Sequence, residues 1–292
     1  MGDGVELLGL YWTVSGPVEV HVGREWSLFG WADRCAEAAK VGFSGLGIWH
    51  ADLEHVLETS NLREMKEVFD DNGLRHLELE FLMDWFLDED DERRRKSDET
   101  REMLFDAAGA FGAHHIKIGN IPGTHAELSQ LTERFGELCA DAAQYTDAKI
   151  VYELMPFDTN VHTIDAALEV VAGAAAANGG IAIDTWHMSK LGIEPDHLRR
   201  IPPEYLSWVE LSDGRLEDME DMIDETVNHR ELPGEGEFEI RHYIEACAEH
   251  GYPGPWGVEV LSDELRNNPI DVIFRRAYET TAGQFGHERS AA

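Results

Sequence analysis

The chain has 292 residues and is strongly acidic, with 58 Asp and Glu residues against 24 Lys and Arg residues and a formal charge of −34. This charge repels nucleic acids and anionic membranes, and it leaves no cationic surface for a phosphate backbone. No apolar run approaches the ~20 residues that a membrane helix needs. We therefore expect neither a nucleic acid nor a membrane as a partner.

The first residues, MGDGVELLGLYW, lack the basic start and the small-residue cleavage site of a secretory signal, so we expect a cytoplasmic protein. Only six of the 24 basic residues are lysines. A Lys-poor, acidic surface favours a halophilic protein from a salt-rich cytoplasm over an ordinary acidic protein, because salt screens the repulsion between like charges.

The charge excess predicts a salt-dependent stability. We expect the melting temperature to rise between low salt and ~2 M KCl, because the Debye length falls to ~3 Å near 1 M and the acidic groups then repel one another less. Thermal unfolding followed by circular dichroism measures this directly. A melting temperature that stays flat or falls over the same range would remove the halophilic interpretation.

Short apolar segments and longer amphipathic segments alternate along the chain, which is typical of strands and helices in turn. The predicted strands are 5–12, 44–49, 75–81, 114–119, 149–154, 180–184, 206–211 and 255–260. Helical patterns between and after them begin near Trp31, Leu62, Ser97, Ala126, Thr163, Glu194, Glu239 and Pro269. Eight such units predict a parallel sheet with right-handed crossovers, and the number eight favours a closed (β/α)8 TIM barrel of α/β class.

Two connections in this pattern are long. Residues 83–98 contain all but the last residue of the charge run DEDDERRRKSDE, which is typical of a solvated loop or the start of a helix. Residues 212–237 follow the seventh strand and include NHRELPGEGE. Because barrels of this kind place their chemistry in the loops after the strands, the second connection is a candidate part of a site.

Four predicted strands end in a carboxylate: KIVYE at Glu153, GIAID at Asp184, LSWVE at Glu210 and PWGVE at Glu259. A single acid at a strand end commonly emerges into solvent. Four in series at the ends of neighbouring parallel strands are expected to converge, since desolvating a lone carboxylate is unfavourable. The sequence therefore predicts a site for one hard divalent metal ion.

The predicted ligand set consists of carboxylate oxygens, which favour Mn²⁺ or Mg²⁺, with Zn²⁺ or Co²⁺ as alternatives. Such an ion polarises a carbonyl as a Lewis acid. Glu153 and Glu259, on opposite sides of the ion, can then act as general base and general acid. Proton abstraction next to a carbonyl leads to ketose isomerisation, to epimerisation or to β-elimination of water.

Five segments of the chain, YELMPF, IDTWH, ELSD, PGEGEF and GVEV, together resemble the xylose isomerase-like barrel family of sugar (phosphate) isomerases and epimerases. That family also holds inosose dehydratases and ketose 3-epimerases. The resemblance covers nearly the whole of residues 1–292, which implies a single barrel domain. It implies that Glu153, Asp184, the strand-seven residue and Glu259 bind the metal, and that Glu153 and Glu259 form the acid/base pair.

The same resemblance implies that His187 and Arg230 contact substrate oxygens. One position departs from the family: most members carry His where this chain has Glu210. Either Glu210 ligates in place of the imidazole or the fourth ligand is lost, and we favour ligation.

Two further residues are candidate substrate contacts. Lys117 lies on the fourth strand and either steadies a substrate oxyanion or forms a salt bridge with Glu80 or Glu153. Trp186 is interpreted as a wall for the apolar face of a sugar, with packing as the alternative. His50 and His115 are interpreted as structural, and Glu235 as part of a loop turn.

The favoured function is a metal-dependent isomerase or epimerase of a ketose or polyol-derived ketone. The alternatives are a dehydratase of a keto-inositol or keto-sugar, and a catalytically silent sugar-binding subunit. The substrate is expected to be an unphosphorylated sugar or polyol, although Arg215, Arg230 and Arg241 are available near the barrel mouth. Assembly into a homodimer or homotetramer is left open.

Overall fold

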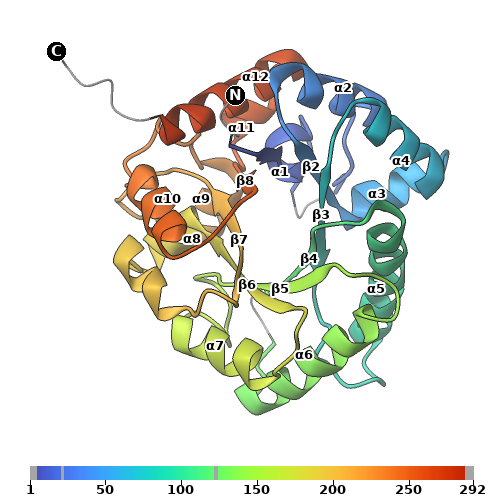
Figure 1. The fold of residues 1–292 in the computed structure, drawn as a ribbon, viewed down its shortest axis with the longest axis vertical. Coiled ribbons are helices and arrows are strands. Elements are labelled where there is room, and N and C mark those ends of the chain that lie inside the picture. Colours follow the sequence, from blue (N-terminus) through green and yellow to red (C-terminus); the bar gives the residue numbers. More distant parts are fainter. Residues whose placement is uncertain (1–4, 21–22, 122–123, 287–292) are drawn as a thin grey trace.

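The computed structural model describes residues 5–20, 23–121 and 124–286. Its eight strands are all parallel and close into a barrel in sequence order, surrounded by helices (Figure 1). This confirms the predicted (β/α)8 TIM barrel. The strands are β1 (Leu7–Gly9), β2 (Gly45–Trp49), β3 (His76–Leu82), β4 (His115–Ile118), β5 (Lys149–Glu153), β6 (Gly179–Asp184), β7 (Leu206–Leu211) and β8 (Trp256–Val258).

The helices cover the outside of the barrel and its carboxyl-terminal rim. They are α1 (Tyr11–Val14), α2 (Trp31–Val41), α3 (His50–Leu57), α4 (Leu62–Asp71), α5 (Glu92–Phe111), α6 (Leu128–Ala142), α7 (Ile164–Gly173), α8 (Thr185–Lys190), α9 (Met222–Asn228), α10 (Ile240–Glu249), α11 (Asp263–Arg266) and α12 (Ile270–Ala282), with 3₁₀ turns η1 (Pro195–Arg200) and η2 (Gly283–Phe285). Among the helices described, none is both long and apolar enough to cross a membrane.

Several elements differ from the pattern predicted by periodicity. The first strand stops at Gly9 because the Leu10 carbonyl accepts hydrogen bonds from the Thr13 and Val14 amides and so starts α1. The charge run after β3 belongs largely to α5, whose start is capped by the Asp91 carboxylate. Near Glu194 there is only the turn η1, since the helix after β6 begins earlier, directly at Thr185.

Two short helices on the rim were not predicted, namely α3 after β2 and α9 after β7. Asp221 caps α9 by accepting hydrogen bonds from the Ile223 and Asp224 amides. The long connection after β7 is therefore ordered, and it places one face of a helix over the barrel mouth.

The interior of the barrel is layered. Mid-strand side chains form a small apolar plug of Leu8, Leu10, Val151, Ala182 and Trp208. A second apolar cluster lies at the carboxyl ends of the strands and includes Trp12, Trp49, Phe81, Met155 and Leu261. The main core is a third cluster. Charged residues occupy the level between the plug and the mouth cluster.

Candidate metal centre

Strand register brings the four predicted ligands to one level. Asp184 pairs with Glu210, and Glu153 pairs with Ala182, which is two residues before Asp184. Residues two apart on a strand share a face, so all these side chains point inward. Glu210 is paired with Gly257. A Cβ at Gly257 would lie 2.9 Å from the Trp208 ring and 3.2 Å from Cγ of Glu210, so glycine makes room for both side chains.

The four carboxylates meet as the sequence predicts. One oxygen from each of Glu153, Asp184, Glu210 and Glu259 lies within 4.8 Å of the others, and all four residues are buried. Ligand atoms of a second set also lie within 4.8 Å of one another, namely those of Glu153, Asp184 and His187. His187 Nε2 lies 3.3 Å from Glu153 Oε1 and 3.5 Å from Asp184 Oδ2.

Lys117 occupies the centre of this acidic level. Its Nζ atom donates hydrogen bonds to Glu259 Oε1 at 2.7 Å and to Glu210 Oε1 at 2.8 Å, and it lies 3.1 Å from Glu80 Oε2. Burial alone would lower the pKa of Lys117, but the surrounding carboxylates raise it well above its ordinary value. The salt bridge to Glu80 that the sequence left open is therefore present, and Lys117 also lines the pocket above.

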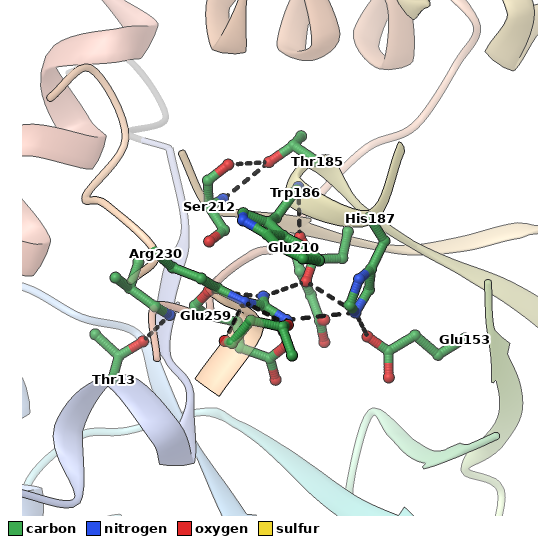
Figure 2. Close-up of polar contacts among 12 residues, drawn as sticks. Thr13, Glu153, Thr185, Trp186, His187, Glu210, Ser212, Arg230 and Glu259 are labelled. Carbon is green, nitrogen blue, oxygen red and sulfur yellow. Dashed lines mark hydrogen bonds and ion pairs between the residues drawn. The ribbon is translucent and has the colours of Figure 1, made fainter. Parts of the chain in front are cut away.

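Arg230 brings a second cation to the carboxylates. Its Nη1 atom donates to Asp184 Oδ2 at 2.6 Å, while Nε and Nη2 donate to the Thr226 carbonyl and hydroxyl at 3.0 and 2.8 Å. Figure 2 shows Arg230 extending past Glu259 towards His187, whose Nε2 atom lies 3.4 Å from Arg230 Nη2 and next to Glu153. Thr226 lies on α9, so the unpredicted helix holds Arg230 in place.

The donor atoms fit a divalent metal ion. Glu210 Oε2 and Glu153 Oε1 are buried and have no hydrogen-bond partner among the described residues, whereas Glu210 Oε1 accepts from both Lys117 and Trp208. Burial and the neighbouring Glu259 raise the pKa of Glu210 well above its ordinary value, although Lys117 opposes them, so the one ammonium group does not fully compensate this carboxylate. The four ligands and Glu80 offer more carboxylates than the two cations Lys117 and Arg230 can neutralise, and a divalent ion would reduce this excess.

Removing the charge of one carboxylate tests whether all four bind the metal ion. We expect Glu210→Gln and Asp184→Asn each to weaken Mn²⁺ binding by at least about tenfold while the fold is kept, since ligand charge is a main determinant of affinity for hard cations. Isothermal titration with Mn²⁺ gives the affinity, and circular dichroism checks the fold. If Glu210→Gln binds Mn²⁺ as wild type does, the four-carboxylate site is wrong and Glu210 is a bystander.

A further acid lies below the metal level. Glu78 is fully buried, both of its carboxylate oxygens lack hydrogen-bond partners, and it lies 3.8 Å from Lys117 Nζ and from His115 Nε2. Burial raises the pKa of Glu78 to about 8 from an ordinary value of 4.5. Its side chain reaches this position because Gly47, which has no Cβ, faces it from β2.

This shift predicts a pH-dependent stability. Between pH 4.5 and about 8 the folded state keeps a proton on Glu78 that the unfolded state releases, so unfolding becomes easier as pH rises. We expect Glu78→Gln to match wild type near pH 4 and to exceed it at pH 8 by more than about 1.4 kcal/mol, the equivalent of one pKa unit. Urea unfolding of metal-free protein at both pH values measures this. Equal stabilities at pH 8 would contradict it.

The pocket above the carboxylates contains about 620 Å³ of space free of protein atoms. Among the predicted site residues, Glu153, Glu259, His187, Arg230 and Lys117 line it. Asp184 and Glu210 lie beneath it, fully buried. Glu80 both lines the pocket and pairs with Lys117.

The structure corrects the interpretation of Trp186 as a wall of the pocket. Trp186 is fully buried and packs behind Arg230, whose guanidinium carbon lies 4.9 Å from the indole centroid. The reason is that Asp184 caps α8 by accepting a hydrogen bond from the Trp186 amide, so the chain turns at once and carries the indole away from the pocket. Trp186 therefore supports the site rather than forming its wall.

The other basic and acidic candidates lie outside the pocket. Arg215 is exposed, Arg241 contacts the η2 turn, and Glu235 pairs with Arg276 on α12. His50 accepts a hydrogen bond from the Phe81 amide, as a structural histidine does. The aromatic wall of Trp12, Trp49 and Phe81 was not predicted, although each residue follows a predicted strand or ends one.

Comparisons with known proteins agree with the fold. The family described as xylose isomerase-like TIM barrel matches residues 35–280. A 3-dehydroshikimate dehydratase of Pseudomonas aeruginosa is 28% identical over 233 residues, which are 79% of this chain and 36% of that protein. The chain thus spans about a third of the length of the curated relative.

Two solved structures show the same fold. The IolI protein with a bound zinc atom has a TM-score of 0.80 at 19% identity, covering 96% of this chain and 98% of that one. D-allulose 3-epimerase from Methylomonas sp. in complex with D-allulose has a TM-score of 0.73 at 18% identity, covering 97% and 98%. With the family match spanning most of its length, the chain belongs to the xylose isomerase-like TIM barrel family.

Proposed function

We propose that this protein is a divalent-metal-dependent enzyme that removes a proton next to the carbonyl of a hydroxyketone. The observation that carries the proposal is the division within the four-carboxylate cluster. Asp184 and Glu210 are fully buried below the pocket, whereas Glu153 and Glu259 line it from β5 and from the end of β8. Two of the ligands are thus available to exchange protons with a substrate.

The bound metal ion would supply Lewis-acid polarisation of the carbonyl. Glu153 is the better placed base, because its Oε1 atom has no hydrogen-bond donor while Glu259 Oε1 accepts from Lys117. His187 lies 3.3 Å from Glu153 and Arg230 lies 3.6 Å from Glu259, and both are proposed to orient substrate oxygens.

Three reactions can follow proton removal. The proton can return to the opposite face of the same carbon (epimerisation), it can return to the neighbouring carbon (isomerisation), or a β-hydroxyl group can leave (dehydration). In the last, Glu153 takes the α-proton, the C–H electron pair forms the new C=C bond, the C–O bond breaks, and Glu259 protonates the departing hydroxyl to give water. The sequence-related relative is a dehydratase, whereas the epimerase is similar in fold alone. We therefore favour dehydration over isomerisation or epimerisation.

The test is incubation of Mn²⁺-loaded protein in D₂O with 3-dehydroshikimate, 2-hydroxycyclohexanone, D-allulose or D-fructose, followed by NMR. Dehydration gives new olefinic or aromatic signals, whereas epimerisation or isomerisation gives a changed ketose with deuterium at the reacting carbon. An epimer without any dehydrated product would reverse our preference between the two reactions. Absence of both product and proton exchange with every ketone would remove the proposed function.

A further inference from the structure

The pocket has two chemically different parts. Among the described residues, the polar lining consists of His187 and the charged residues at the floor together with Thr226, whereas ten of the seventeen lining residues are apolar. All charged groups therefore face one end of a bound molecule. The other end meets hydrocarbon and aromatic rings.

The apolar part is a packed cluster at the barrel mouth, distinct from the main core. Trp12 and Trp49 have ring centroids 4.7 Å apart, and the Trp49 and Phe81 rings are 6.2 Å apart and within 12° of parallel. Met155 and Leu261 belong to the same cluster. On the far side, α9 contributes Ile223, Thr226 and Val227 to the lining.

The described wall offers few side-chain hydrogen-bonding groups, and two of them already have partners. The Trp49 indole N–H donates to Glu25 at 3.1 Å, and the Thr226 hydroxyl accepts from Arg230 at 2.8 Å. A sugar or inositol carries a hydroxyl on nearly every carbon. Burying such hydroxyls against an apolar wall without partners is unfavourable, whereas burying methylene groups there is favourable.

We propose that the substrate has two unlike ends: a hydroxyketone or vicinal diol at the carboxylate floor, and a hydrocarbon ring or chain between the aromatic wall and α9. The identity of the reacting end rests on the proposed function. The chemical class of the other end is inferred from the apolar wall. This wall excludes a molecule hydroxylated at every carbon.

A matched pair of unreactive probes tests this class without any turnover. cis-1,2-Cyclohexanediol and myo-inositol share a six-membered ring and a vicinal diol, but the first has four methylenes where the second has hydroxyls, and neither has a carbonyl. We expect calorimetry on the full-length, Mn²⁺-loaded protein to show the cyclohexanediol binding at least about tenfold tighter, since each buried methylene favours binding. Equal or tighter binding of myo-inositol, or binding of neither at millimolar concentration, would overturn the proposal.

Substitutions in the apolar wall test whether the wall causes the preference for cyclohexanediol. Met155→Gln and Ile223→Asn are expected to reduce the cyclohexanediol preference at least about threefold, because each adds hydrogen-bonding groups to the apolar lining. Leu216→Asn is the matched control: Leu216 is exposed, lies on the same connection as Ile223, and does not line the pocket. An equal loss in the control would contradict a role of the wall. Failure of proton exchange with all ketones, with this preference intact, would remove the proposed reaction and leave the wall's specificity standing.

Discussion

Replacing Glu153 or Glu259 by Gln is expected to lower kcat by at least about 10²-fold, the lower end of what general acid–base catalysis contributes. Both carboxylates line the pocket at the metal level, and glutamine keeps their shape while removing the charge and the proton-accepting oxygen. Steady-state turnover of the substrate found by NMR gives kcat. Glu235→Gln is the control, because Glu235 pairs with Arg276 outside the pocket.

Exchange of the substrate α-proton with D₂O distinguishes the loss of a metal ligand from the loss of a catalytic acid or base. With metal content equalised, a variant that lacks the base should stop exchange of the α-proton with D₂O, whereas a variant that lacks the acid should retain exchange and lose product. We expect Glu153→Gln to show the first behaviour and Glu259→Gln the second. If wild type turns over in D₂O with no deuterium incorporated and none exchanged, a hydride shift within the substrate is the better account, and both residues are ligands only.

Replacing Lys117 by Met is expected to destabilise the metal-free protein by about 3–5 kcal/mol, the cost of removing one partner of a buried ion pair. Its side chain is 1% exposed and its ammonium group is shared by Glu80, Glu210 and Glu259, so its loss removes the cation that these three buried carboxylates have in common. Urea unfolding with and without Mn²⁺ measures the effect. Mn²⁺ should restore part of the lost stability, because it returns positive charge to the same carboxylates.

Lys190→Met is the matched control for Lys117→Met. Lys190 is also buried and pairs at 2.7 Å with a buried carboxylate, that of Glu225, but it lies outside the acidic cluster. We expect Lys190→Met to be destabilised without any additional rescue by Mn²⁺. A Lys117→Met protein as stable as wild type, or one that Mn²⁺ rescues no better than the control, would show that the ammonium does not compensate the cluster.

The barrel and its four acids were predictable because both depend on local patterns. Strand periodicity places Glu153 and Asp184 at strand ends, and parallel order brings the ends together. For Lys117 the sequence left open a substrate contact or a salt bridge with Glu80 or Glu153, because its position among three carboxylates depends on β3, β7 and the end of β8 at once. No local pattern contains that information.

The errors lie where a residue's direction is set by a turn. IDTWH looks like a strand followed by a loop, yet capping by Asp184 begins a helix and reverses the direction of Trp186. The role of α9 was missed for a similar reason. Its contact with Arg230 through Thr226 depends on how a long connection folds back across the barrel mouth.

The four carboxylates belong to the barrel strands or directly follow them. Ile223 and Val227 instead lie on the rim helix α9, which is not hydrogen-bonded into the sheet. Substitutions on that helix can therefore change which molecules are accepted without moving the reacting groups. A mutant library confined to these two positions, with Arg230 and Thr226 kept fixed, is the shortest route to new selectivity on an unchanged catalytic base.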